Sequence, residues 1–344
     1  MSSSELRKDI VSGEWVVLSP GRARRPDAFI KKVPRERAPK HTCPFEDPQA
    51  TEHGEPLLVY PEGALHSTSR LNKRDRWRVQ IVRNKFPAFL HERKCSPATP
   101  FGPYQVMEGI GYHHLLLTRD HNKNYPELSL HEATLVFQLF QKHYKDLERD
   151  KCVKYISFFQ NWGPKAGASL YHPHYQIMAL PIVPPDVGRS LLGSKTYYRK
   201  HKACVHCMVL NWEREEKKRI VYETKHAVVF VPYISREPFE ARIFPKRHEA
   251  YFEDAAPAVL EDVARALQLV LRKMKQKLKD PDYNFFIHSA PAYEKEKFRH
   301  YHWHIEVLPK LSISAGFELG TGMQVSVVDP DEAARLLRIK GGKL

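Results

Sequence analysis

Three side chains suited to phosphoryl chemistry stand at every second position of the segment SLYHPHYQ (169–176). They are His172, His174 and Gln176, and Pro173 separates the two histidines. In an extended chain, residues i, i+2 and i+4 project from one face of a strand. Pro173 favours extended backbone for itself and for the residue before it. We therefore expect the two imidazoles and the amide to line one surface.

An imidazole held beside a fixed neighbour is a candidate nucleophile or base. Neutral imidazole can attack phosphorus, and the phosphoramidate that forms is itself reactive, so one difficult transfer becomes two easier steps. We interpret His174 as the nucleophile and Gln176 as a donor to a phosphoryl oxygen. The alternative is that these are hydrogen-bonded residues of the core. Small and polar residues that could form an anion cradle precede the strand, namely Asn161, Gly163, Gly167 and Ser169.

Cysteines and histidines form a second pattern, which predicts metal binding. A Cys-x-x-Cys pair followed at a distance by two histidines is typical of tetrahedral zinc sites. The later half of the chain offers Cys204, Cys207, His248 and His302. The earlier half offers Cys43, Glu46, His121 and His172, where glutamate replaces the second cysteine. We expect one or two zinc ions per chain.

The set in the earlier half of the chain, which contains Glu46, leaves two interpretations open. Glutamate ligates zinc through oxygen, so Glu46 could complete a mixed site, and the adjacent Asp47 is a substitute. The alternative is a site that has lost its metal and is held by hydrogen bonds. In each set one metal ligand is the first histidine of a strand with alternating histidines, His172 or His302. This histidine is expected to have a structural role, which leaves His174 available for chemistry.

The elements that must position these residues occur twice. Each copy has a cysteine-containing turn, an apolar run ending near a histidine, a long amphipathic helix, a β-rich segment and a strand with alternating histidines. This repetition predicts a duplicated α+β unit. A segment rich in Pro and Gly, 181–195, is expected to be a turn-like joint between the copies.

The two helices have clear start signals. The first is expected over about 130–149 and begins with a capping box of Ser129 and Glu132. The second is expected over about 256–279, with Pro257 in its first turn. The strands are expected at 155–161, 172–176, 283–289 and 302–306.

Composition limits the class of protein. The chain has 344 residues, of which 42% are hydrophobic and 28% charged, as in an ordinary globular protein. The start, MSSSELRKDI, lacks the apolar stretch of a signal peptide, and no run of 18 apolar residues predicts a membrane span. Five cysteines, two of them in a Cys-x-x-Cys pair, fit a reducing compartment, so we expect a cytoplasmic protein.

The net charge of +15 favours anionic ligands. Nucleic acid and phosphorylated metabolites are the two classes of ligand that it suggests, and the alternative is a surface that is basic for solubility alone. A nucleic-acid-binding protein on a decayed enzyme fold is therefore a remote alternative. The basic residues lack the regular aromatic interleaving that stacks bases, so nucleic acid is not the partner we expect.

The motif H-P-H-x-Q resembles that of the galactose-1-phosphate uridylyltransferase family, the transferase branch of the histidine-triad fold. The resemblance extends over nearly the whole chain. The hydrolase branch carries a histidine where this chain has Gln176, so the glutamine favours transfer over hydrolysis. The segments that carry the resemblance are DIVSGEWVVLSPGRARRP (9–26), RNKFPAF (83–89), TRDHNKNYPELS (118–129), FFQNWGPKAGASLYHPHYQ (158–176) and HYHWHIEVLPKLSISAGFELGTG (300–322).

The resemblance implies an α+β fold built from two histidine-triad-like units, each an antiparallel sheet with helices packed on it, related by a pseudo-twofold axis. Residues 1–185 would form the half with the active-site strand. Residues 186–344 would form the half with a structural metal site and a tail that binds the hexose phosphate. In that second half, Trp303 and Glu306 make the strand a poor copy, so one active strand per chain is expected.

The resemblance also implies a ping-pong reaction. His174 would take UMP from UDP-glucose and pass it to galactose 1-phosphate, with Gln176 binding the phosphoryl group. The nucleotide-binding residues by resemblance are Arg22, Arg25, Asn84, Phe86, Asn161, Gly167 and Ser169. The residues that would grip the hexose 1-phosphate, across the interface of a homodimer, are Phe317, Glu318 and Gln324.

Two alternatives follow from the same resemblance. Some family members transfer adenylyl groups from ADP-glucose to phosphate, so an ADP-glucose phosphorylase is the second reaction to consider. Other members build their second metal site from an H-x-H pair, so His288, His302 and His304 are an alternative to the Cys-x-x-Cys set.

Overall fold

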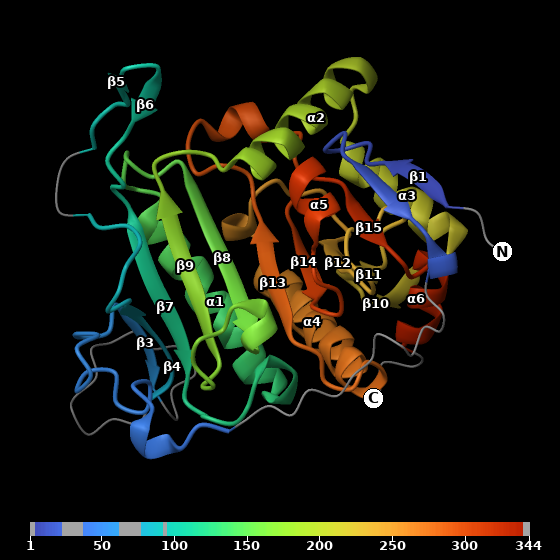
Figure 1. Ribbon diagram of the computed structural model, residues 1–344. Coiled ribbons are helices and arrows are strands. Elements are labelled where there is room, and N and C mark those ends of the chain that lie inside the picture. Colours follow the sequence, from blue (N-terminus) through green and yellow to red (C-terminus); the bar gives the residue numbers. More distant parts are fainter. Residues whose placement is uncertain (1–3, 23–36, 62–76, 92–94, 340–344) are drawn as a thin grey trace.

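The computed structural model describes residues 4–22, 37–61, 77–91 and 95–339. Its centre is one ten-stranded sheet with the strand order β10-β11-β12-β14-β13-β8-β9-β7-β4-β3 (Figure 1). All neighbouring pairs in this sheet are antiparallel. Its strands are β3 Leu58–Pro61, β4 Trp77–Arg83, β7 Tyr112–Thr118, β8 Tyr155–Trp162, β9 His174–Leu180, β10 Ile220–Glu223, β11 Ala227–Phe230, β12 Ala241–Pro245, β13 Tyr283–His288 and β14 His304–Pro309.

The sheet is the sum of two five-stranded halves that meet at the β8–β13 pair. At this join Phe159 lies opposite Phe286. On the side of β8 away from the join, Phe159 pairs with Gln176 of β9. On the side of β13 away from the join, Phe286 pairs with Glu306 of β14. The two halves are therefore related by a pseudo-twofold axis at the join. The predicted fold class, a duplicated histidine-triad-like α+β unit, is confirmed.

Two long helices cover one face of the sheet (Figure 1). They are α1, Leu130–Leu147, and α4, Pro257–Lys277. The predicted capping box is present, because the Ser129 hydroxyl accepts from the Glu132 N–H and the Glu132 carboxylate accepts from the Ser129 N–H. The main hydrophobic core lies between these helices and the sheet, so the other face is left for the site.

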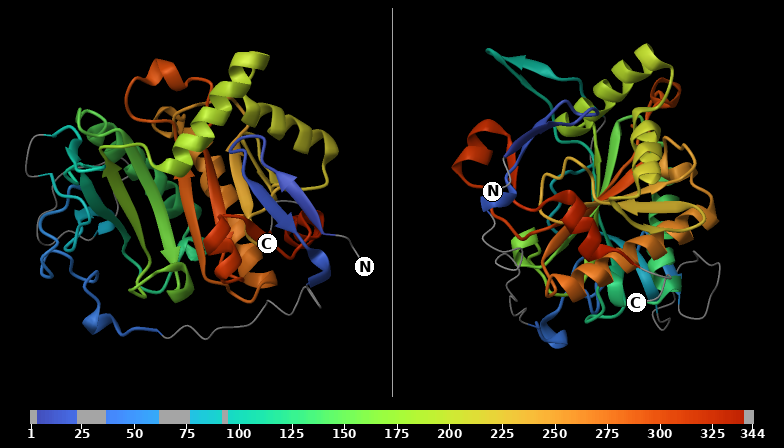
Figure 2. Two further views of the ribbon diagram at one scale, coloured as in Figure 1. Left: turned by 45° about the horizontal axis from the view of Figure 1, so that its top comes forward. Right: turned by 90° about the vertical axis from the view of Figure 1, so that its right-hand side faces the viewer.

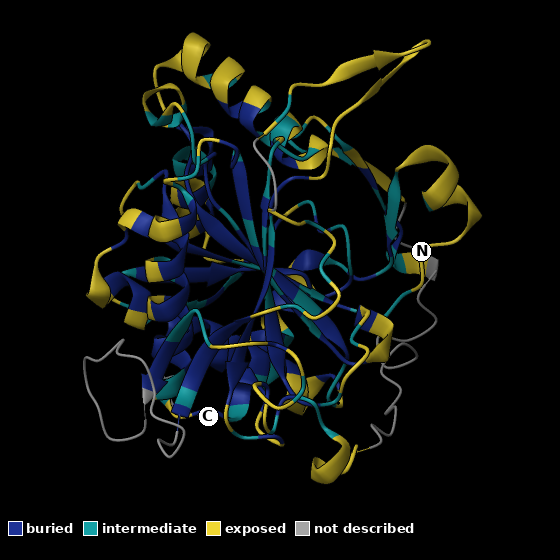
Figure 3. Cartoon of the chain, turned by 90° about the vertical axis from the view of Figure 1, so that its left-hand side faces the viewer, coloured by how far each residue is buried: buried dark blue, intermediate teal, exposed yellow. Residues whose placement is uncertain are grey.

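Smaller elements surround this framework (Figure 2). A three-stranded sheet joins the two ends of the chain and consists of β1 Glu5–Lys8, β2 Trp15–Leu18 and β15 Gln324–Ser326. A separate hairpin projects from the body with every strand residue exposed (Figure 3), and it consists of β5 Thr99–Phe101 and β6 Tyr104–Val106. The other helices are α2 Pro185–His201, α3 Val205–Glu216, α5 Gly316–Thr321, α6 Pro330–Leu337 and the 3-10 helices η1 Pro20–Arg22, η3 Lys40–Thr42, η4 Tyr125–Glu127, η5 Pro164–Ala166, η6 Phe252–Asp254 and η7 Lys295–Phe298.

The expected turn-like joint at 181–195 is wrong over most of its length, because helix α2 begins at Pro185. Proline is well tolerated in the first turn of a helix, where its missing N–H would be unpaired in any case. Gly193 is needed for packing, since a Cβ there would lie 1.6 Å from the Val11 carbonyl oxygen. Pro and Gly in this segment therefore mark a helix start and a close approach.

Two of the five cysteines differ from expectation. Cys95 and Cys152 form a disulfide, which ties the segment before β5 to the turn between α1 and β8. The other three, Cys43, Cys204 and Cys207, are free thiols. Among the helices in the described ranges, none is both long enough and apolar enough to cross a membrane.

Candidate active site and metal sites

The imidazole of His174 is buried and held in one orientation. Its Nδ1–H donates to the His172 carbonyl oxygen at 2.9 Å, so the Nε2 atom carries the lone pair. Burial lowers the pKa of His174, which keeps the ring neutral near pH 7. The ring lies 5.2 Å from that of Phe45. A neutral imidazole with its Nδ1–H occupied and its Nε2 lone pair free is the form that attacks an electrophile.

His174 opens into a pocket of about 550 Å³ beside strand β9. The pocket brings together five of the residues expected from the sequence, which come from two segments far apart in the chain, 84–86 and 169–176. His174 and Gln176 share one face of β9, as the alternation predicted, whereas His172 lies just before the strand begins. The expected residues that line the pocket are Asn84, Phe86, Ser169, His174 and Gln176.

The amide of Gln176 is oriented by His113, a residue that sequence reasoning missed. The Ala88 backbone N–H donates to His113 Nδ1 at 3.1 Å, so Nε2 of the neutral ring carries the proton. Burial lowers the pKa of His113, in keeping with this neutral form. Nε2–H then donates to the Gln176 carbonyl oxygen at 3.0 Å. With its oxygen occupied in this way, Gln176 is left with its NH₂ group as a donor.

Other residues of the pocket were also missed. His53 is buried, and its Nδ1–H donates to the Arg83 carbonyl oxygen at 2.9 Å, so its Nε2 is an acceptor. Lys85 brings a cation to the pocket and is paired with Glu52 at 2.8 Å. No spacing rule identifies these residues, because the fold brings them together from segments far apart in the chain. The full set of missed residues in the pocket lining is Pro44, Phe45, Thr51, His53, Lys85, Leu115 and Leu170.

The glycine-rich loop after β8 leads directly to Ser169. Gly163 and Gly167 adopt positive φ of 84° and 86°, which favours glycine. The Asp282 carboxylate accepts from the Lys165 N–H at 2.8 Å and leaves no room for a Cβ at Gly163. Asn161 Oδ1 accepts from the Asn284 amide at 2.8 Å. Asn161 and Gly167 therefore support the loop, and neither is among the residues that line the pocket.

The remaining expected ligand residues lie elsewhere. Phe317 and Glu318 are in α5, and Gln324 is in β15. Phe317 is 49% exposed, and the described lining of the pocket includes no residue of α5 or β15. Arg22 ends η1 without a described side chain, and Arg25 lies outside the described residues.

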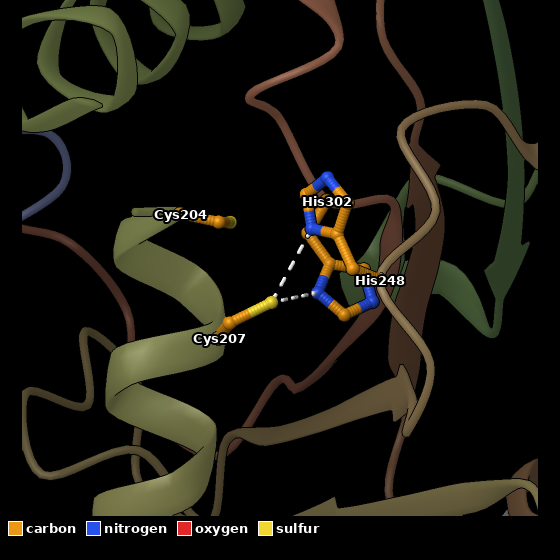
Figure 4. Close-up of side chains that lie close together, drawn as sticks. All are labelled: Cys204, Cys207, His248 and His302. Carbon is orange, nitrogen blue, oxygen red and sulfur yellow. Dashed lines mark hydrogen bonds between the residues drawn. The ribbon is translucent and has the colours of Figure 1, made fainter. Parts of the chain in front are cut away.

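Four predicted metal ligands of the second half converge at the start of α3 (Figure 4). Cys207 Sγ lies 3.3 Å from His248 Nδ1 and 3.5 Å from His302 Nδ1, and Cys204 lies one turn earlier. His248 Nε2–H donates to the Arg299 carbonyl oxygen at 2.8 Å, which leaves Nδ1 free to ligate. The hydrogen bond from Cys207 lowers the pKa of Cys204 and favours its thiolate. Two sulfurs and two nitrogens at these separations fit a tetrahedral zinc ion.

The first-half set is also assembled. Ligand atoms of Cys43, His121 and His172 lie within 4.8 Å of one another, and Glu46 Oε1 lies 3.2 Å from His121 Nδ1. Both histidines turn Nε2 to a backbone carbonyl, of Ala38 and of Thr118, each at 2.8 Å. The buried atoms Glu46 Oε1 and His121 Nδ1 have no hydrogen-bond partner among the described residues. A divalent cation would satisfy both, so Cys43, Glu46, His121 and His172 also fit a metal.

The alternative set around the H-x-H pair is not the one that the fold assembles. His302 points to the cysteines, whereas His288 and His304 group with Glu306. Glu306 is already bound by two cations, since it pairs with Arg242 at 3.2 Å and with Arg236. The two histidines of the H-x-H pair thus belong to different clusters.

Two family models match the chain. The model described as "Galactose-1-phosphate uridyl transferase, N-terminal domain" matches residues 1–184, and the model described as "HIT domain" matches residues 213–310. Among curated proteins, the chain is 32% identical to an ADP-glucose phosphorylase of Arabidopsis thaliana, over 98% of this chain and 93% of the relative. It is 29% identical to a galactose-1-phosphate uridylyltransferase of Thermotoga maritima, over 97% and 98%.

Solved structures show the same two kinds of relative. The chain superposes on an Arabidopsis thaliana ADP-glucose phosphorylase with bound ADP-glucose with a TM-score of 0.78 and 28% identity, covering 98% of this chain and 99% of the other. It superposes on a uridylyltransferase with a TM-score of 0.72 and 27% identity, covering 98% of both chains.

Proposed function

The chain belongs to the galactose-1-phosphate uridylyltransferase family, and we propose that it is a nucleotidyltransferase that works through a covalent intermediate on His174. The donor is a nucleoside-diphosphate hexose. The observation that carries the proposal is the orientation of His174, whose Nδ1–H is occupied and whose Nε2 lone pair faces a pocket shared with Gln176, Asn84 and Ser169.

In the first step, Nε2 of His174 attacks the α-phosphorus of the donor. An N–P bond forms, the bond from that phosphorus to the bridging oxygen breaks, and hexose 1-phosphate leaves with the electron pair. The His172 carbonyl, which accepts from Nδ1–H, stabilises the positive charge that develops on the ring. In the second step an oxygen of the acceptor attacks the same phosphorus, and the N–P bond breaks.

The Gln176 amide is the donor to the non-bridging oxygens in both steps. Because His113 occupies its carbonyl oxygen, the NH₂ group is oriented before the substrate arrives. Such preorganised donors account for much of the acceleration in phosphoryl transfer. Lys85 and, by family resemblance, Arg22 and Arg25 would add positive charge around the phosphates.

The metal sets have a structural role in this proposal. A zinc ion held by Cys204, Cys207, His248 and His302 would fix the start of α3 against β14. A metal held by Cys43, Glu46, His121 and His172 would fix the segment before β9, and with it the carbonyl that orients His174. In neither place does the ion need to touch the substrate.

We place phosphorolysis of ADP-glucose first among the specific reactions, with an AMP–His174 intermediate and phosphate as acceptor. The 32% identity and the TM-score of 0.78 to ADP-glucose phosphorylases support this order. Uridylyl transfer from UDP-glucose to galactose 1-phosphate, which we expected first from the sequence, is the second candidate. The relative from Thermotoga maritima supports it.

Isotope exchange tests the proposal and separates the two reactions. The protein is incubated with labelled glucose 1-phosphate and either ADP-glucose or UDP-glucose, without an acceptor. A covalent intermediate predicts that label enters the donor, and the donor that exchanges faster identifies the base. His174→Ala should show no exchange with either donor. If the wild-type protein turns over but does not exchange label, transfer is direct and the proposal is wrong.

We further propose a homodimer in which α5 and β15 of one copy complete the pocket of the other. The exposure of Phe317 and its separation from the pocket of its own chain support this. We also keep 1–185 and 186–344 as the proposed halves and the cytoplasm as the proposed compartment. The three free thiols agree with a reducing compartment, whereas the Cys95–Cys152 disulfide is the feature that argues against it.

A further inference from the structure

A second pocket, of about 370 Å³, lies in the other half of the molecule. It is bounded by α3, by the ends of β11 and β12 and by the segment that follows β1. None of the residues placed in the nucleotide-binding pocket takes part in it. Its volume falls within the range of small-molecule sites.

Strand register shows that this pocket occupies the position equivalent to the first. In the first half Gln176 pairs with Leu115, and Leu115 pairs with Val82. In the second half Glu306 pairs with Arg242, and Arg242 pairs with Phe230. The same steps across the sheet therefore lead from β9 to β4 and from β14 to β11.

The walls beyond these strands also correspond. Two residues after Val82 the chain enters the first pocket with Asn84, Lys85 and Phe86. Two residues after Phe230 it enters the second pocket with Pro232, Tyr233 and Ile234. The second pocket is thus the symmetry mate of the first, with an apolar wall where the first has Asn and Lys.

The cysteine-containing turns make the same contribution to both pockets. Phe45, two residues after Cys43, lies 5.2 Å from the ring of His174. His206, two residues after Cys204, lies 5.3 Å from the ring of His304. Each cysteine-containing turn therefore places an aromatic ring in its pocket and against the histidine that begins the strand, His174 of β9 or His304 of β14.

The groups that would perform transfer are absent from the second pocket as described. His304 is the counterpart of His174, and Glu306 is the carboxylate that replaces Gln176. Both line a smaller cavity beside the second pocket and not the pocket itself, and His304 Nε2 lies 3.6 Å from Glu306. Glu306 and Glu240 are matched by Arg236 and Arg242, so the charges of this cluster balance. The cluster offers neither a free nucleophile nor an unpaired cation for a phosphate.

The outer walls are aromatic and rigidly held. Trp212 and Tyr233 pack edge to face with their centroids 6.5 Å apart. The Arg219 guanidinium lies 5.0 and 5.1 Å from the two ring centroids, and that of Arg7 lies 3.9 Å from the Tyr233 ring. Arg219 is in turn fixed by Glu213. Aromatic walls that are ordered before binding cost little conformational entropy when a ligand arrives.

We infer that this second pocket is a non-catalytic binding site for the planar heteroaromatic ring of an uncharged nucleoside. Its equivalence to the first pocket argues for a base-sized ring. The charged residues of its lining, Lys8 and Arg242 against Asp9 and Glu213, balance, which argues against a phosphate. The choice of a nucleoside rests on the proposed function of the first pocket. The position, the apolar lining and the missing nucleophile do not depend on it.

Adenosine is the probe, because it carries no phosphate and cannot act as a donor. Binding is measured by calorimetric titration in Leu170→Trp, whose added ring fills the first pocket. One adenosine per chain is expected to bind. Adding Val209→Trp, which fills the second pocket, should abolish this binding. Adding Trp212→Ala, which removes a partly exposed wall, should weaken it roughly tenfold, about the size of one stacking contact.

The single variant Val209→Trp serves as the control for folding. It should keep the melting temperature and the isotope exchange of the wild-type protein, because Val209 lies outside the first pocket. If Val209→Trp does not fold, Trp212→Ala alone decides. Adenosine binding that both variants leave unchanged, or no binding by Leu170→Trp up to the solubility limit, overturns the inference. Neither result affects the exchange test of His174, so the two proposals fail separately.

Discussion

At the scale of single residues, the site depends on buried histidines whose tautomers are fixed by backbone groups. A backbone carbonyl can only accept and a backbone N–H can only donate. The His172 carbonyl therefore leaves the lone pair of His174 on Nε2, and the Ala88 N–H makes Nε2 of His113 a donor to Gln176. Two backbone atoms thus orient both the proposed nucleophile and the amide that we propose binds the phosphoryl group.

His113→Phe should misorient Gln176 and lower kcat roughly tenfold to a hundredfold, the usual cost of a misplaced transition-state donor. The KM for the donor should change little, because the amide acts mainly on the developing charge. Steady-state kinetics with the preferred donor measure both constants. His113→Gln, which can again accept and donate, should recover part of kcat.

The neighbouring histidine supplies the matched control. His114 faces the opposite side of β7, where it hydrogen-bonds to His143 at 2.8 Å. His114→Phe should lower the melting temperature with kcat nearly unchanged. If His114→Phe lowers kcat as much as His113→Phe does, then His113 acts through the stability of β7 and not through Gln176.

At the scale of elements, the glycine-rich loop and the cysteine-containing turns hold the site in place. The loop after β8 is braced by Asp282, which belongs to the other half of the molecule. The turns bring candidate metal ligands against strands β9 and β14. Each element that carries chemistry is therefore fastened to a segment distant in sequence.

Gly163→Ala should destabilise the protein by about 1–3 kcal/mol, because it adds a Cβ at positive φ and 2.0 Å from the Asp282 carboxylate. It should also raise the KM for the donor, since the loop leads to Ser169. Urea unfolding and steady-state kinetics measure the two effects. Gly188→Ala, in helix α2 with open space around it, should instead stabilise by about 0.5–1 kcal/mol. Equal behaviour of the two variants would contradict this account of the loop.

Metal removal should act on stability before it acts on chemistry. Cys207→Ser should remove one metal per chain and cost on the order of several kcal/mol of folding free energy. Glu46→Gln should weaken metal binding by the set of Cys43, Glu46, His121 and His172. It should leave metal binding by the Cys204–Cys207 set unchanged. Elemental analysis and melting curves with and without chelator measure both. His201→Asn, at an exposed position of α2, is the control. Full metal content in Cys207→Ser would disprove this site.

Local patterns predicted the parts of the site that lie within one element. Alternation placed His174 and Gln176 on one face, and the capping box placed the start of α1. His113, His53 and Lys85 were missed because they reach the pocket through strand register and loop closure, which leave no spacing in the sequence. Helix α2 was missed because proline is common both in turns and in the first turn of a helix, and glycine is common both in turns and at close approaches such as that of Gly193 to Val11.

At the scale of the whole molecule, the continuous sheet makes the two halves interdependent. The join buries Phe158 and Phe285 on the same core as α1 and α4. The duplication also explains how one chain can hold two equivalent pockets, of which only the first contains the proposed nucleophile. In each half the framework is kept, whereas the side chains at the positions of Gln176 and Glu306 differ, and we propose that this difference confines transfer to the first half.

A dimer with shared sites predicts complementation between two inactive variants. His174→Ala lacks the nucleophile, and Phe317→Ala combined with Gln324→Ala lacks the proposed hexose-phosphate grip. Mixing them under conditions of subunit exchange should restore part of the exchange activity, because one pocket of each mixed dimer is intact. Analytical ultracentrifugation tests whether the protein is a dimer. Absence of any recovery in dimers shown to have mixed would mean that each chain completes its own pocket.

The most direct measurement is the intact mass of the protein after incubation with ADP-glucose or UDP-glucose and no acceptor. The account predicts a gain equal to an adenylyl or a uridylyl group, which is the nucleoside monophosphate less one water. It also predicts an adduct that maps to His174 and its discharge by phosphate or by galactose 1-phosphate respectively. His174→Ala should gain no mass. An unchanged mass for a wild-type protein that turns over the same donor, or an adduct on any other residue, would contradict the account.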